Sequence, residues 1–314
     1  MTWLFLDETR RLRTCWRFVL FGFGFLFVQI VVSLVVGVGF VVYLIATGDS
    51  PNGLLVDPKL LEKWTIPLQI IAAVPMTLGT LGCVLICRRY LDRRSIWSLG
   101  LGRPKRGFAT CLTVGFMAGF GPVVFVIGLL LLVGGLKWTG FSGSLQTVLL
   151  IPTFVVMAFF EEILCRGYLL QNLIDVRRPW FGVIFTSLVF WLLHGLNPAA
   201  WSSPLIGLNL FGAGVTLALA YRVGGNIWFP TAMHFGWNLA QGVVFEVPVS
   251  GLHTDGLIDV RLAEGASVWL TGGDFGMEGS ALTTLAEIWL SVLLGGLLLK
   301  SPRQLSGEAD VFID

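Results

Sequence analysis

Long apolar runs recur along the chain, and they constrain the fold more than any other feature of the sequence. A helix needs about 20 predominantly apolar residues to cross the hydrocarbon core of a bilayer. The chain is 55% hydrophobic and only 13% charged. We therefore expect an all-α, polytopic membrane protein that forms a single membrane domain over residues 1–314. About eight transmembrane helices are expected, over residues 18–46, 64–87, 107–135, 147–174, 181–196, 205–222, 226–246 and 283–299.

The distribution of basic residues predicts how these helices are oriented. Cytoplasmic loops of membrane proteins carry an excess of Lys and Arg. Most of the 21 Lys and Arg residues lie in segments that would share one side of the membrane, namely 1–17, 88–106, 176–180, Arg222 and 300–314. The opposite side would hold only Lys59, Lys63, Lys137 and Arg261. We therefore expect a multi-pass protein of the cell membrane with both termini in the cytoplasm.

The small net charge of +2 argues against a nucleic-acid partner. The basic segments are better explained as topology signals that lie beside anionic membrane lipids. The one long polar stretch, residues 247–281, is acidic and is predicted to be an external loop. Apolar alternation at 259–263 and 267–271 would permit a small hairpin inside it. The five cysteines show no CxxC spacing, so we expect free, buried thiols.

Three ionisable side chains interrupt the apolar run from about Val148 to Leu173. They are Glu161, Glu162 and Arg166, and a charged side chain at the centre of a bilayer costs roughly 2.5–3.5 kcal/mol on insertion scales. Glu162 and Arg166 are four residues apart in the order that favours an ion pair on a helix. Glu161 is left over and needs a proton, a histidine or a metal to compensate its charge.

Two of the three histidines also fall in predicted spans. His194 ends the fifth span, and His234 lies in the seventh with Asn238 one helical turn further on, on the same face. Together with Glu161 these side chains come from the fourth, fifth and seventh helices. They could converge on one buried active site between those helices.

The spacing of these residues resembles a known family. The three motifs are Glu161-Glu162-x-x-x-Arg166, Phe190-x-x-x-His194 and His234-x-x-x-Asn238. In this order they are similar to the signature of the type II CAAX prenyl protease and bacteriocin-processing (CPBP, or Abi) intramembrane protease family. The flanking residues 166–169 and 225–230 agree as well. The resemblance covers a catalytic core at about 147–245, and it departs from the family at Cys165, where an aromatic residue is usual.

The resemblance implies an intramembrane endopeptidase. Glu161 and His194 would activate a water molecule, and His234 and Asn238 would bind the developing oxyanion. Glu162 and Arg166 would hold the geometry of their helix. The family is often treated as metal-dependent, and Glu161, His194 and His234 form a plausible set of ligands for Zn²⁺. A metal-free mechanism with Glu161 as general base is equally compatible with these residues.

The substrate implied by the resemblance is a membrane-anchored protein or peptide, prenylated as in CAAX proteins or held by a transmembrane helix. Counting residues from Arg177 and Arg222 places the site in the cytoplasmic half of the membrane, where it is expected to open. The same count leaves His194 too far from His234 unless the fifth span begins inside the cytoplasmic boundary or tilts strongly.

Three other interpretations remain open. Gly140-Phe141-Ser142-Gly143 matches the GxSG of serine intramembrane proteases, but it falls in a predicted loop of small residues. Intramembrane Glu, His and Arg residues also form proton relays, so a proton-coupled transporter is an alternative. A non-catalytic membrane scaffold or immunity protein could keep the same fold.

Overall fold

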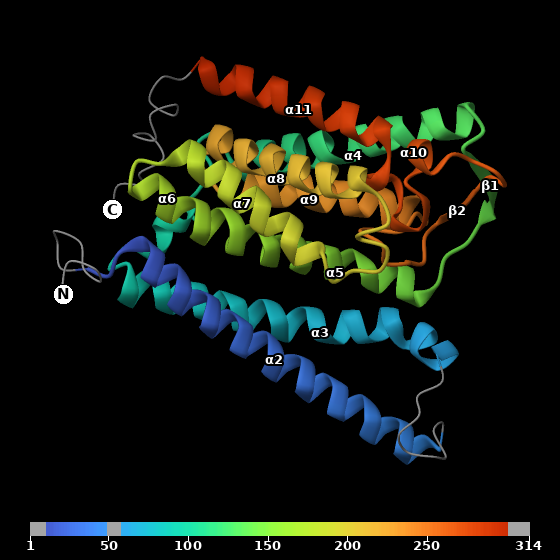
Figure 1. Ribbon diagram of the computed structural model, residues 1–314, viewed down its shortest axis with the longest axis horizontal. Helices are drawn as coiled ribbons and strands as arrows, with labels where there is room; N and C mark the ends of the chain where they lie inside the picture. The colour runs from blue at the N-terminus through green and yellow to red at the C-terminus, as the bar shows by residue number, and fades with distance from the viewer. Residues whose placement is uncertain (1–10, 49–57, 301–314) are drawn as a thin grey trace. The chain divides into compact units, whose positions relative to one another are not determined.

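The computed structural model describes residues 11–48 and 58–300 of the chain. Both predicted cytoplasmic ends, residues 1–10 and 301–314, lie outside the described residues. The chain divides into two compact units, with the boundary after Arg93. Both units consist mainly of helices, as Figure 1 shows, which confirms the predicted all-α polytopic membrane fold.

The first unit contains two long helices, α2 (Thr14–Thr47) and α3 (Pro58–Ile86), and the short η1 (Cys87–Leu91). α2 packs along α3. Arg17 and Arg88 are buried, and both pair with Asp92, at 2.8 and 3.3 Å. Arg88 was counted among the topology signals of the basic loop, yet it lies inside the protein as part of an internal charge cluster.

The second unit holds the remaining helices. They are η2 (Ile96–Leu99), α4 (Phe108–Leu132), α5 (Leu145–Glu162), η3 (Ile163–Leu170), α6 (Gln171–Asp175), α7 (Pro179–His194), α8 (Pro204–Gly224), α9 (Trp228–Asn238), η4 (Leu239–Val244), α10 (Val268–Thr271), η5 (Gly273–Phe275), η6 (Met277–Gly279) and α11 (Ala281–Leu299). α8 packs against α7, α9 and α11, and α4 packs against α9. All three motifs lie in this unit.

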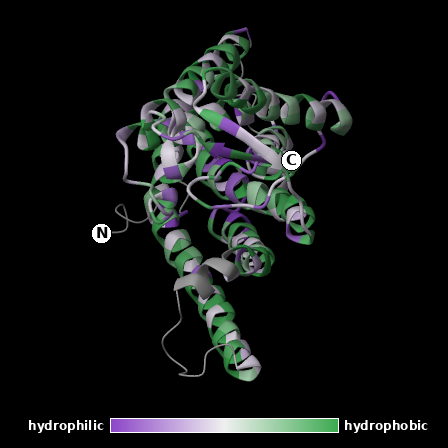
Figure 2. Ribbon diagram, turned by 90° about the vertical axis from the view of Figure 1, so that its right-hand side faces the viewer, coloured by the Kyte–Doolittle hydropathy of each residue, from purple (hydrophilic) through white to green (hydrophobic). Residues whose placement is uncertain are grey.

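Each predicted span contains a helix, but not every helix is long enough to cross a bilayer alone. Within the described residues, six helical stretches are long and apolar enough, at 14–47, 66–91, 108–132, 145–175, 204–224 and 281–299. α7 is shorter and apolar. The number of crossings, expected to be about eight, therefore stays a prediction. Figure 2 shows that the long helices are mostly hydrophobic along their length. Exposed side chains such as Val292 (70%) and Leu132 (83%) suit a surface that faces lipid.

Local sequence signals fix the ends of the helices that carry the site. The Ser144 hydroxyl accepts hydrogen bonds from the backbone N–H groups of Gln146 and Thr147, and the Thr147 hydroxyl accepts one from the Ser144 N–H, which forms a capping box at the start of α5. Ser203 caps α8 in the same way ahead of Pro204. α8 ends where Gly225 adopts a left-handed conformation.

A two-stranded sheet lies at one end of the second unit (Figure 1). β1 (Leu136–Phe141) pairs antiparallel with β2 (Ile258–Leu262). The predicted hairpin inside residues 247–281 is therefore wrong, because residues 258–262 pair with a strand far away in sequence and residues 268–271 form the helix α10. Alternation predicted the strand at 258–262, but it carried no information about the partner strand.

Glycines allow α4 and α9 to pack closely. A Cβ atom added at Gly119 would overlap the backbone carbonyl of Met233, and one at Gly236 would overlap the carbonyl of Phe116. Small residues let membrane helices approach until their backbones touch. The contact at Met233 fixes the backbone next to His234, so this packing positions the third motif.

We predict that Gly119→Ala destabilises the protein by about 1–3 kcal/mol, because the new methyl group forces the two backbones apart. Gly128→Ala on the same helix is the matched control, since nothing lies within 4 Å of the added atom and no proline follows it. The control should be neutral or stabilising by up to about 1 kcal/mol, given the helix propensity of alanine. Thermal unfolding of both variants in detergent measures the difference. Equal stability of the two would show that α4 and α9 are not in backbone contact.

Candidate active site

Glu162 is the buried centre of the cluster formed by the three motifs. It ends α5, and its side chain is fully buried. Glu162 Oε1 accepts a hydrogen bond from Arg166 at 2.8 Å, and it lies 3.1 Å from Nδ1 of His234. The ion pair predicted from the i, i+4 spacing is confirmed. The sequence did not indicate that the same oxygen also contacts His234, on α9.

Arg166 connects this cluster to two further helices. Its guanidinium donates a hydrogen bond to the backbone carbonyl of Gly214 on α8 at 3.0 Å. The guanidinium also lies over the ring of Phe190 on α7, 4.8 Å from the ring centre. Both Arg166 and Glu162 are completely buried. A paired charge of this kind can persist in an apolar interior because its hydrogen bonds and its partner replace water.

His194 and His234 both direct a ring nitrogen toward Glu161. Nε2 of His194 lies 3.7 Å and Nε2 of His234 lies 3.9 Å from Glu161 Oε2. These distances are too long for direct hydrogen bonds. The ring of Phe190 packs against both imidazoles, with centres 4.6 and 5.9 Å apart. The structure therefore brings the left-over carboxylate and both intramembrane histidines together, from three helices.

The other ring nitrogens fix what these three groups can bind. Nδ1 of His194 lies 2.8 Å from the backbone carbonyl of Phe190, and a carbonyl only accepts. Nδ1 of His194 therefore carries a proton, and the contact with Glu162 assigns the same state to Nδ1 of His234. In the neutral rings both Nε2 atoms are then acceptors. Glu161 Oε2 is buried without a partner, so three acceptors converge on a gap that suits a proton donor or a cation.

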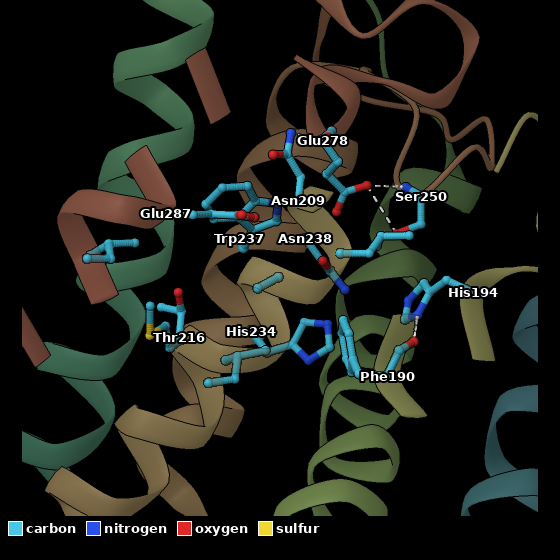
Figure 3. Close-up of a pocket in the computed structure, with 15 residues that line it drawn as sticks. Phe190, His194, Asn209, Thr216, His234, Trp237, Asn238, Ser250, Glu278 and Glu287 are labelled. Carbon is cyan, nitrogen blue, oxygen red and sulfur yellow. Dashed lines mark hydrogen bonds between the residues drawn. The ribbon is translucent and has the colours of Figure 1, made fainter. Parts of the chain in front are cut away.

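A small pocket opens beside this gap. It is lined by Phe190, His194, Asn209, Leu210, Ala213, Thr216, Leu217, Met233, His234, Trp237, Asn238, Ser250, Glu278, Glu287 and Leu290. Figure 3 shows the Asn238 side chain pointing into the pocket near both histidines. The side chains expected from the sequence therefore meet at one place, with Asn238 at its edge. Glu161 itself is 16% exposed.

Four polar residues of the pocket were not found from the sequence. Ser250 and Glu278 belong to the stretch predicted as an external loop, and Asn209 and Glu287 lie on α8 and α11. Glu278 Oε2 accepts hydrogen bonds from the N–H and the hydroxyl of Ser250, at 2.5 and 3.0 Å. Burial raises the pKa of the Glu278 carboxyl, and the Ser250 N–H opposes this rise. The sequence signal was present, because Glu287 is an acidic residue inside an apolar span, but it was not used.

The length of α7 separates His194 from Arg177. α7 begins directly after Arg178 and ends at His194, so His194 lies a helix length away from these two arginines. Ser250 and Glu278 line the pocket from residues 247–281, on the side opposite to Arg177. The predicted bounds of the fifth span are therefore close to those of α7, and the opening of the site toward the cytoplasm stays a prediction.

Residues 96–100 cover the turn that precedes α9. Asn226 and Ile227 in this turn are buried, and the Ile227 N–H donates to the carbonyl of Gly100 at 2.9 Å. α9 therefore starts inside the protein, and the depth of His234 below the membrane surface stays a prediction.

Ser142 does not lie at this site. Its hydroxyl is 2.7 Å from a carboxylate oxygen of Glu246 and 2.8 Å from the carbonyl of Gly256. These contacts join the loop after β1 to the 247–281 stretch.

Among the described residues the cysteines are free, as expected, and three of them are buried, but Cys15 is exposed.

The Glu161, His194 and His234 side chains are chemically suited to zinc, and the orphaned Glu161 oxygen lies between the two imidazoles. Two ligand atoms on one tetrahedral zinc ion are about 3.3–3.6 Å apart, given metal–ligand distances of about 2.0–2.2 Å. The observed 3.7 and 3.9 Å are slightly wider. Across the described residues no group of three His, Cys, Asp or Glu side chains is compact enough to hold a metal ion as it stands. Small side-chain rotations would be needed.

A comparison with protein families gives one match. Residues 143–240 match the family model described as "Type II CAAX prenyl endopeptidase Rce1-like". The matched region contains all seven named residues of the three motifs, and it ends before Ser250, Glu278 and Glu287. No curated protein and no solved structure gives a match. The resemblance inferred from the three motifs is thereby confirmed for the core of the second unit.

We predict that Arg166→Ala lowers both the folded yield and the stability, by about 3–5 kcal/mol, because it leaves Glu162 buried without its partner. The double variant Glu162→Gln with Arg166→Met removes both charges and should recover most of this loss. Arg178→Ala, at an exposed position of the same unit, is the control and should be neutral. Detergent-solubilised yield and thermal unfolding measure the effects. A fully stable Arg166→Ala variant would mean that Glu162 does not depend on this ion pair.

Proposed function

Because residues 143–240 match the Rce1-like family model of type II CAAX prenyl endopeptidases, we propose that the chain is an intramembrane endopeptidase. In this proposal it cleaves a membrane-anchored protein or peptide with a water molecule activated by Glu161 and His194. The observation that carries the proposal is the convergence of three acceptor atoms, Glu161 Oε2 and the two imidazole Nε2 atoms, on one gap. A water molecule there would donate its two protons and present its oxygen to a peptide carbonyl.

The residues supply each step of a metal-free hydrolysis. Glu161 takes a proton as the water oxygen bonds to the carbonyl carbon, and it returns that proton to the amine nitrogen as the C–N bond breaks. Before the substrate binds, His234 takes a proton from solvent at Nε2. Nδ1–H then bonds Glu162 and Nε2–H donates to the oxyanion, while the attacking water donates to Glu161 and His194. Asn238, one turn along the same helix, adds a second donor. Glu162 and Arg166 position His234 and do not contact the substrate.

A zinc ion is the alternative way to fill the same gap. Glu161, His194 and His234 would hold it, and it would supply a Lewis acid and lower the pKa of a bound water. The proposal covers both versions, because each uses the same three side chains. The proposed substrate anchor is either a prenyl group, as in CAAX proteins, or a transmembrane helix. Membrane lipids are the other proposed contact, and both termini are proposed to be cytoplasmic.

We predict that Glu161→Gln, His194→Ala and His234→Ala each abolish cleavage of a membrane-anchored peptide while the protein still folds. Asn238→Ala should reduce kcat by about 10²–10³, the usual cost of losing one oxyanion donor. Glu264→Gln, at an exposed position of the 247–281 stretch, is the matched control. Cleavage of fluorescent peptides in proteoliposomes provides the measurement. Full activity in any of the first three variants contradicts the site, and solute or proton flux without cleavage would support the transporter alternative.

Metal dependence is predicted separately. If zinc fills the gap, purified protein contains about one zinc per chain, and a chelator removes both metal and activity. If the Glu161 water mechanism operates alone, metal-free protein keeps full activity. Elemental analysis combined with cleavage before and after chelation distinguishes the two. Glu161→Gln provides the control, because the zinc version predicts that this variant loses metal as well as activity.

A further inference from the structure

Two carboxylates outside the family-matched region line the pocket beside the proposed catalytic groups. Glu278 reaches it from η6 and Glu287 from the first turns of α11 (Figure 3). Neither is part of the three motifs. Glu287 lies inside an apolar span and is only 6% exposed. A carboxylate inside an apolar span normally pairs with a cation or a hydrogen-bond donor. The groups around Glu287 therefore indicate which kind of ligand it binds.

Glu287 has no partner among the residues that the structure describes. Neither of its carboxylate oxygens has a hydrogen bond or an ion pair there. One of them lies so close to Gly212 on α8 that an added Cβ atom at this glycine would overlap it. At Gly212, α8 therefore leaves the space in which the carboxylate lies. The side chain lies on the inner face of α11 and contributes to the lining of the pocket.

The other polar groups of the lining are already satisfied. The Asn209 amide donates to the backbone carbonyls of Glu278 and Ser280 and accepts from Thr284. The Thr216 hydroxyl lies 2.7 Å from that of Ser291. Glu278 uses only Oε2, in its bonds with Ser250, and Oε1 has no hydrogen bond within the described part of the chain. Apart from the catalytic groups, the lining atoms without a hydrogen bond in the described part of the chain are carboxylate oxygens of Glu278 and Glu287, which accept, and the indole N–H of Trp237, which donates.

The rest of the pocket limits what such a ligand can be. Its cavity measures about 50 Å³, which is room for about three water molecules. Leu210, Leu217 and Leu290 make much of the wall apolar, and Phe190 and Trp237 add aromatic rings. Aromatic rings and carboxylates both favour an ammonium group, and an alkyl chain that carries it suits the apolar wall. The pocket has the wrong charge for a free carboxylate.

We propose that this pocket is a cation subsite for the substrate, which holds the ammonium group of a lysine side chain or a free amino group close to the scissile bond. The inference rests on the proposed endopeptidase function and adds the chemical class of one substrate residue. Glu287 and Glu278 are its specificity-determining residues. They act by binding the substrate, and they are not placed in the hydrolytic machinery.

A binding experiment tests the subsite without requiring cleavage. The probes are membrane-anchored peptides in which a single lysine moves one position at a time through the juxtamembrane segment, each paired with its acetyl-lysine analogue. Binding to the Glu161→Gln protein in nanodiscs is measured by fluorescence anisotropy. At one position or a few adjacent ones the lysine peptide should bind about tenfold more tightly than its analogue, as a charge-assisted hydrogen bond predicts. Adding Glu287→Gln should reduce this preference to about twofold or less.

Control variants separate charge from folding. Glu287→Gln keeps the size of the side chain, and its thermal unfolding is compared with that of the parent. If that variant does not fold, Glu278→Gln tests the same preference from the other side of the pocket. Glu264→Gln removes an exposed charge from the same stretch and should leave the lysine preference unchanged. The proposal is overturned if no lysine position is preferred, or if a folded pocket variant keeps the full preference.

Cleavage assays distinguish failure of this inference from failure of the proposed function. If peptides bind with a lysine preference but wild-type protein cleaves none of them, the endopeptidase function fails and the cation subsite stands. If peptides are cleaved with equal kcat/KM whether lysine or acetyl-lysine is present, the function stands and the subsite is overturned. If both hold, kcat/KM for the preferred lysine peptide should fall about tenfold in Glu287→Gln, with little change for the acetyl-lysine peptide.

Discussion

One buried carboxylate oxygen organises the second unit. Glu162 Oε1 contacts both the Arg166 guanidinium and the His234 imidazole, and Arg166 in turn contacts Gly214 and the ring of Phe190. Through these contacts α5, α7, α8 and α9 share one polar centre in an apolar interior. An unpaired charge there would cost several kcal/mol, so the four helices are held at the spacing that keeps it paired. The proposed catalytic groups then lie on a scaffold fixed by electrostatics as well as by packing.

The same centre determines which atoms face the open gap. Glu162 and the carbonyl of Phe190 occupy the Nδ1 atoms of the two histidines, which leaves both Nε2 atoms for Glu161 and whatever lies between them. These contacts hold both imidazole rings in place and leave the two Nε2 atoms without a hydrogen bond. The close packing of α4 against α9 at Gly119 and Gly236 also fixes the backbone of the helix that carries His234. Unsatisfied acceptors are tolerated at such a place because a substrate, a water or an ion can satisfy them.

The parts of this design that could be predicted from the sequence are local. The Glu162–Arg166 pair follows from spacing on a single helix, and the helices follow from the apolar runs that contain them. The contact between Glu162 and His234 joins residues far apart in sequence, so no periodicity predicts it. The pairing of β1 with β2 and the approach of Glu278 to the pocket are long-range in the same sense. The cover of the turn at Asn226 by residues 96–100 is long-range as well, so counting residues from Arg222 could not predict it.

Both helices that carry paired motif residues change their winding directly after them. η3 begins at Ile163, the residue after Glu162, and η4 begins at Leu239, the residue after Asn238. A π segment accommodates an extra residue in the helix, as an insertion of one position would. In each helix, the part before the π segment carries Glu161 or His234. The side chains after the π segment point in directions that are rotated about the helix axis from those of a regular α-helix. In the first helix the π segment includes Arg166, so the winding of η3 sets the direction in which Arg166 meets Glu162 and Gly214. Deleting one position there would turn Arg166 away from both partners, so an insertion or deletion in this segment would be felt at the gap.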